Sequence, residues 1–129
     1  MRMDTRAKIL TVAAARALEP ARPLAIAAGT FDVLLAEDAR ELAEVRNRTG
    51  ARTVMVVVLR SAREVLNQRG RAELAAALCM VDYVLTAGDE EFDKLVACFR
   101  PTEVVHLEGA HARRLGELIE HARERQIAG

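Results

Sequence analysis

The sequence predicts an α/β fold, a Rossmann-like three-layer sandwich with a parallel sheet of four to five strands and helices on both faces. Short β-branched runs alternate with longer segments of helical period, which is typical of βαβ units. The run 54–59 is apolar throughout, as expected for a parallel strand that is covered on both faces. Gly29 directly follows the first apolar run, at the kind of strand end where open α/β sheets bind ligands.

Proline and glycine residues mark the ends of the expected elements. Pro20 and Pro23 stop the first helix, and Gly50 ends the second as a left-handed cap. Gly88 precedes a helix that opens with acidic residues, which the helix dipole favours there. The expected strands are 24–28, 54–59, 83–86 and 103–107. The expected helices are 5–18, 35–48, 62–66, 71–78, one that starts near residue 89, and 110–126, with a turn at 68–70.

Composition predicts one domain, 1–129, and excludes several classes of partner. Lys plus Arg equal Asp plus Glu at 19 each, so no net charge attracts nucleic acid or a membrane surface. Every apolar run is far shorter than the roughly 20 residues that span a bilayer. The N-terminus lacks a signal-peptide core, and a cytoplasmic protein is expected. Cys79 and Cys98 are expected to be buried thiols, because two isolated cysteines make neither a disulfide framework nor a zinc site.

The segment after the first strand has the features of an anion-binding turn. It reads Gly29-Thr30-Phe31-Asp32-Val33-Leu34-Leu35-Ala36-Glu37-Asp38. Glycine lets the backbone approach a phosphate closely, and the next helix offers N–H groups to an anion. Alone this is a weak signal, because Asp32 and Thr30 are also common capping and turn residues.

The first half of this segment resembles the signature Gly-(Thr/Cys)-Phe-Asp-x-x-His-x-Gly-His of the cytidylyltransferase-like nucleotidyltransferases. Further landmarks resemble the nucleotidyltransferase domain of bifunctional ADP-heptose synthases and occur in the same order. They are Lys-Ile-Leu-Thr at 8–11, the stretch 71–84, and Arg100-Pro101 before the fourth strand. The resemblance covers most of the chain. It implies descent from a transferase of sugar-nucleotide and lipopolysaccharide precursor synthesis.

The second half of the signature is missing. In the family both histidines contact the triphosphate, whereas Leu35 and Asp38 stand at those positions here, with Glu37 in place of the glycine. Leucine donates no hydrogen bond, and the two carboxylates repel phosphate groups. Each lost donor to a transition-state oxygen costs on the order of a hundredfold in rate. The family's phosphate-handling segments after the second and fourth strands and near the C-terminus are altered too, which favours a pseudoenzyme.

The resemblance leaves a possible ligand site and no assigned catalytic residue or metal ligand. Arg71 is expected either to contact a nucleotide or to pair with nearby acids, and the residues do not decide between the two. His106, when protonated, can take the place of a family lysine. His111 and His121 are expected to be solvated helix residues. The expected ligand-binding residues are Gly29, Thr30, Phe31, Asp32, Arg71 and His106.

Three carboxylates in the loop and the helix start also allow a hard-cation site. Asp32, Glu37 and Asp38 have the oxygen ligands that such a cation prefers. Stabilisation of the helix start by acidic residues explains the last two better.

Three functional hypotheses follow from the sequence. The leading one is a protein that has lost nucleotidyl transfer and serves as a binding or regulatory partner, as a homodimer or with another protein. The second is a divergent but active nucleotidyltransferase. The third is a sensor that binds a nucleotide without turnover. The cofactor is open, with ATP or CTP and magnesium expected if nucleotide binding is retained.

Overall fold

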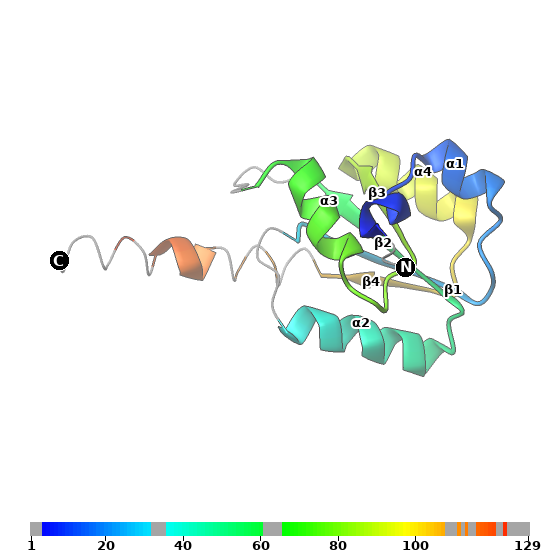
Figure 1. Ribbon diagram of the computed structural model, residues 1–129, viewed down its shortest axis with the longest axis horizontal. Helices are drawn as coiled ribbons and strands as arrows, with labels where there is room; N and C mark the ends of the chain where they lie inside the picture. Colours follow the sequence, from blue (N-terminus) through cyan, green and yellow to red (C-terminus); the bar gives the residue numbers. More distant parts are fainter. Residues whose placement is uncertain are drawn as a thin grey trace.

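The computed structural model describes residues 4–31, 36–60 and 66–107, together with 111, 113, 116–120 and 123. In these residues four parallel strands form one sheet in the order β3-β2-β1-β4 (Figure 1). The predicted α/β, Rossmann-like arrangement is confirmed. The strands are β1 (Leu24–Gly29), β2 (Thr53–Leu59), β3 (Tyr83–Ala87) and β4 (Glu103–His106). The named helices are the 3₁₀ helix η1 (Thr5–Lys8), α1 (Val12–Ala17), α2 (Ala36–Thr49), α3 (Gln68–Ala76) and α4 (Asp89–Phe99).

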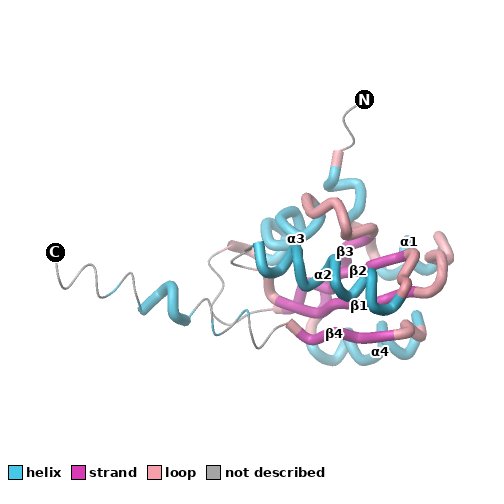
Figure 2. The backbone as a smooth tube through the Cα atoms, turned by 90° about the horizontal axis from the view of Figure 1, so that it is seen from below, coloured by secondary structure: helices cyan, strands magenta, loops and turns pink. Residues whose placement is uncertain are grey.

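Two apolar cores lie on the two faces of the sheet, whose four strands Figure 2 shows side by side. Side chains of β1 and β2 alternate between the faces, as strand geometry requires. On one face Val56 packs with Leu42 of α2 and Ala75 of α3. On the other face Val57 and Phe92 belong to the core that α1 and α4 complete. All residues of β1 and β2 are buried, which explains their continuous apolar runs.

The strand order reverses beside β1. The chain passes from β1 to β2 and β3 on one side and then crosses to place β4 on the other side of β1. In open parallel sheets, the crevice at such a reversal lies beyond the carboxyl ends of the strands and is the usual ligand site. The loop that begins at Gly29 therefore starts at this position.

The N-terminal segment is not the single helix that the sequence predicts. The 3₁₀ helix η1 and α1 are separated by an extended stretch in which Ile9 forms a bridge with Val84 of β3. The Leu10 N–H donates to the Val84 carbonyl at 2.9 Å. Thr11 then caps α1 by accepting from the Ala14 N–H. Residues 9 and 10 are extended despite their helical propensity, because their pairing satisfies backbone groups along the outer edge of β3.

Other element boundaries differ from the expected ones by a few residues. The turn expected at 68–70 is wrong, because these residues form the first turn of α3 with Asn67 as its cap. The helix expected at 62–66 lies almost wholly outside the described residues. Of the last expected helix, residues 116–120 are helical, and Figure 1 shows this segment beyond the sheet, away from the helical layers.

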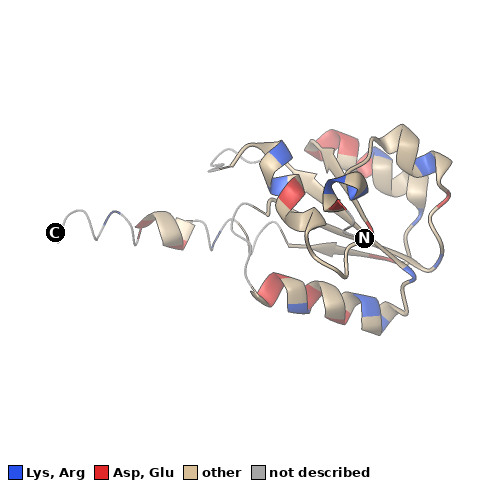
Figure 3. Ribbon diagram, in the orientation of Figure 1, with Lys and Arg blue, Asp and Glu red and all other residues tan. Residues whose placement is uncertain are grey.

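The surface carries charged residues of both signs and both cysteines. Basic and acidic residues share the same helices, α2 and α3 among them, rather than gathering by sign (Figure 3). Both cysteines are exposed, so the expectation of buried thiols is wrong. Within the described ranges, no helix has the length and apolar character needed to cross a bilayer.

Candidate functional site: a loop closed by a buried histidine

The loop after β1 lies against the end of β4. Ala28 pairs with His106, and the Leu107 N–H donates to the Ala28 carbonyl at 2.7 Å. A few residues later, the His111 N–H donates to the Leu107 carbonyl at 2.9 Å. This hydrogen bond holds residue 111 near the end of β4. As a result, residue 111 lies beside residues 29–31.

The imidazole of His111 caps the loop. The backbone N–H groups of Thr30 and Phe31 both donate to its Nδ1, at 3.1 and 3.2 Å. An imidazole nitrogen that accepts a hydrogen bond carries no proton, so the geometry indicates the neutral tautomer with its proton on Nε2. Only 3% of His111 is exposed. The expectation that His111 is a solvated helix residue is therefore wrong.

Asp38, in the first turn of α2, holds the other side of the ring. His111 Nε2 donates to Asp38 Oδ1 at 2.9 Å, and each of the two side chains is 1% exposed. A buried carboxylate needs such donors, because taking its charge out of water is costly. Asp38 thus has more than the expected role of an acidic residue in a first helical turn. It orients the ring that closes the loop.

Gly29 leaves the space that the His111 ring fills. A Cβ placed on Gly29 would lie 2.5 Å from His111 Cε1 and 2.9 Å from Phe31 Cε2. The Phe31 and His111 rings meet edge to face, with centroids 4.6 Å apart. The close approach that the sequence predicts at Gly29 is real, and the group that makes it is an imidazole of the same chain.

The Arg71 side chain links the loop after β1 to the neighbouring strand β2. Its side chain has no exposed surface, and its Nη1 donates to the carbonyls of Thr30 and Leu59, at 3.0 and 2.6 Å. Its Nε donates to the Leu66 carbonyl at 3.2 Å. Both roles that the sequence leaves open for Arg71, a nucleotide contact and a partner for nearby acids, stay predictions. The contacts show a guanidinium that joins three backbone segments.

The structure brings four of the six predicted ligand-binding residues together. Gly29, Thr30, Phe31 and Arg71 form one buried cluster. His106 is exposed at the end of β4, where its ring contacts Phe92 edge to face at 5.8 Å. The remaining predicted residue, Asp32, lies outside the described residues.

As folded, the loop does not fit the phosphates of ATP or CTP. Thr30 is 9% exposed and Phe31 has no exposed surface, and the N–H groups of both residues already donate to His111. The buried Asp38 carboxylate adds a negative charge beside the same position. Among the described residues, no group of three or more acidic, histidine or cysteine side chains could hold a metal ion.

His111 and Asp38 are the two site residues that sequence reasoning missed. They are 73 positions apart, so no local spacing links them. One signal could have found them, because the carboxyl ends of parallel strands meet at one edge of the sheet. A histidine shortly after the fourth strand and an acid in the first turn after the first strand are both brought to that edge.

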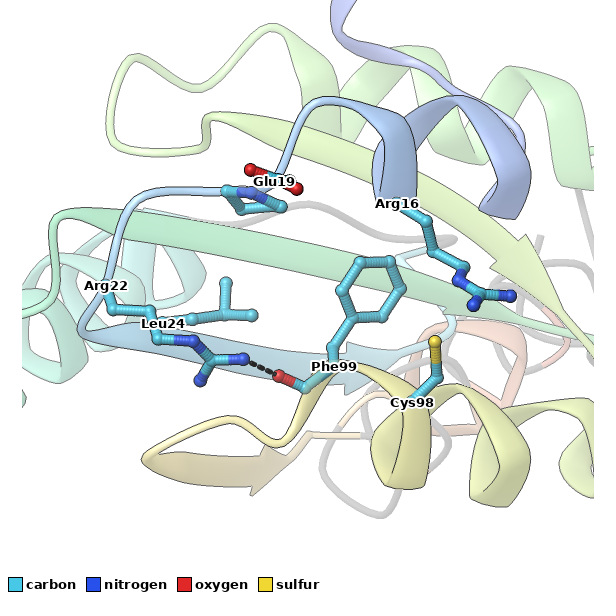
Figure 4. A pocket seen from close by; sticks show the side chains of 7 residues that line it. Arg16, Glu19, Arg22, Leu24, Cys98 and Phe99 are labelled. Atoms are coloured by element: carbon cyan, nitrogen blue, oxygen red, sulfur yellow. Dashed lines mark hydrogen bonds between the residues drawn. The ribbon is translucent and has the colours of Figure 1, made fainter.

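A separate cavity of about 300 Å³ lies at the opposite end of β1 (Figure 4). The Arg22 side chain donates to the carbonyls of Phe99 and Arg100, at the end of α4. Figure 4 shows Arg16 and Cys98 on the far side of the Phe99 ring from Arg22. This cavity lies at the amino ends of the strands, where the resemblance places no ligand-binding residue.

Comparison with known proteins supports the fold and no more. No family model and no curated protein matches the chain. The structure is similar to the crystal structure of a lipopolysaccharide core biosynthesis protein from Thermoplasma volcanium, with a TM-score of 0.56 and 22% sequence identity. The similarity covers 63% of this chain and 70% of that one.

Proposed function

We propose that this chain is a nucleotidyltransferase-like domain that has lost nucleotidyl transfer and serves as a binding or regulatory partner, with a second copy or another protein. One observation carries the proposal. The N–H groups of Thr30 and Phe31, which directly follow β1, donate to His111 of the same chain, where the resemblance implies a nucleotide. Nucleotidyl transfer depends on donors that stabilise charge on the phosphate oxygens. These donors are occupied.

Two further features support the loss of catalysis. Leu35 and Asp38 replace both histidines of the family signature, and Asp38 is turned onto His111. Arg71, a residue with the charge to bind phosphate, donates to backbone carbonyls instead. The order of the sequence landmarks and the similarity in fold to a lipopolysaccharide core biosynthesis protein support descent from this family.

A turnover assay tests this proposal directly. The protein is incubated with ATP or CTP, magnesium and sugar phosphates, and pyrophosphate release is measured. We expect no release above background. Turnover near the order of 10 per second that is typical of enzymes would overturn the proposal in favour of a divergent transferase. Light scattering coupled to size exclusion measures whether the protein is a dimer.

A nucleotide sensor is the second candidate, and a specific feature favours it. The Thr30 and Phe31 N–H groups still converge on one acceptor, as they would on a phosphate oxygen. Calorimetry with ATP, CTP, CDP and AMP separates the two candidates. Binding without turnover favours the sensor, and the absence of heat with every nucleotide favours a role in protein interaction alone.

A further inference from the structure

We propose that the Thr30 and Phe31 amides are a phosphate cradle that His111 keeps closed, so that a phosphoryl group and the imidazole compete for the same two donors. The inference rests on the proposed function, since it concerns the site that the family resemblance marks. It adds what closes the site and which residue holds it closed. His111 is the occupant, and Asp38 is its positioning residue.

The amide pair has the geometry of an anion site. Two successive N–H groups point at a single atom, with N to Nδ1 distances of 3.1 and 3.2 Å. Phe31 has a φ of 54°, a left-handed conformation of the kind found in such nests of successive amides. Successive amides that converge in this way form concave sites for anions. A neutral imidazole nitrogen is a weaker acceptor for them than an ionised phosphate oxygen.

The His111 ring is held at the cradle from both sides. Its Nδ1 accepts from the amides while its Nε2 donates to Asp38, so the protonation state that serves one contact also serves the other. The Phe31 ring packs against it at 4.6 Å. An anion that enters must break these contacts and also approach the Asp38 carboxylate. The contacts of the His111 ring and the negative charge of Asp38 explain why the wild-type cradle is closed.

Removal of the ring should therefore open the cradle. The His111→Ala variant keeps both amides and removes the competing acceptor. We expect phosphate to bind it at least about tenfold more tightly than the wild type, the factor expected when one neutral hydrogen bond no longer has to be broken. In the Asp38→Asn variant the negative charge is gone and the ring is held less firmly, so we expect a smaller gain.

The experiment is a titration of the ¹⁵N-labelled protein followed by amide NMR signals. Inorganic phosphate, ATP and cytidine are added in separate arms to the wild type and to each variant. We expect the Thr30 and Phe31 signals of His111→Ala to shift saturably with phosphate and ATP and not with cytidine. An ATP affinity above that of phosphate identifies a nucleotide as the ligand class, and equal affinities identify the phosphoryl group alone.

Two variants serve as controls. His111→Asn puts a carbonyl oxygen near the position of Nδ1, and we expect it to keep the cradle closed as in the wild type. His121→Ala makes the same change as His111→Ala ten positions along the chain, and we expect wild-type behaviour. Signal dispersion in the starting spectra reports whether each variant is folded.

The proposal is overturned if folded His111→Ala shows no shift at Thr30 and Phe31, or if the wild type binds phosphate equally well. If His111→Ala does not fold, Asp38→Asn decides, and an affinity equal to that of the wild type overturns the proposal. Nucleotidyl transfer by the wild type would end the proposed function without affecting these titrations. The two failures are thus distinguishable.

Discussion

The two ends of β1 show opposite uses of polar groups. At the carboxyl end, the backbone groups of Thr30 are satisfied by His111 and Arg71, which are distant in sequence and fully or almost fully buried. At the amino end, a cavity remains open beside Arg22, which is exposed. The comparison teaches that polar groups at the carboxyl end of β1 are used in contacts within the fold, whereas the amino end leaves space beside an exposed side chain.

Loss of Arg71 should have the largest effect on stability. Arg71→Met keeps much of the side-chain volume and removes the donors to the Thr30, Leu59 and Leu66 carbonyls. Each buried acceptor left without its donor costs about 1–3 kcal/mol, so we expect a loss of roughly 3–5 kcal/mol. Urea unfolding followed by circular dichroism measures the change. A loss below about 1 kcal/mol would show that the guanidinium is not a tie between backbone segments.

A methyl group at Gly29 should have the next largest effect. Its Cβ would lie 2.5 Å from the His111 ring, so Gly29→Ala is expected to cost about 1–3 kcal/mol through overpacking. Gly88→Ala is the matched control at the end of β3, because its Cβ would meet nothing closer than 3.5 Å. The double variant with His111→Ala should recover part of the loss. Additive losses in this cycle would contradict direct contact between the two positions.

The elements of the sheet could be predicted from the sequence because their signals are local. The apolar run of β2 and the glycine that ends β1 reflect burial and backbone geometry within a few residues. The N-terminal segment could not be predicted in this way. Ile9 and Leu10 have helical neighbours, and only their pairing with Val84 of β3 makes them extended.

The position of the candidate site could be predicted from the sequence, but the side chain that fills it could not. Gly29, Thr30 and Phe31 lie at the expected edge of the sheet, and Gly29 makes the expected close approach. The partner in that approach could not be read from the sequence. His111 looks like a helix residue among charged neighbours, and its burial depends on contacts with Asp38 and Phe31 across the fold.

At the amino end of β1, a loss of Arg22 should have a moderate effect. Arg22→Met removes the donors to the Phe99 and Arg100 carbonyls at the end of α4. These carbonyls are closer to solvent than those around Arg71, so water replaces part of what is lost. We expect a loss of about 1 kcal/mol in the same urea experiment. A loss as large as that of Arg71→Met would remove the contrast between the two ends.

The smallest effect is expected at the ion pair between Arg48 and Glu103, which lie 2.6 Å apart at the surface near the amino end of β4. The hydrogen bond and the charge of Glu103 raise the pKa of Arg48. A raised pKa stabilises the folded state below the unfolded value, which for arginine lies far above neutral pH. The contribution of Arg48 should therefore stay constant between about pH 6 and pH 9, where arginine keeps its charge. Because exposed ion pairs are screened by water and salt, Arg48→Met should leave the urea midpoint almost unchanged. A clear loss of stability that disappears in high salt would contradict this expectation, because it would show that the charges of this exposed pair stabilise the fold.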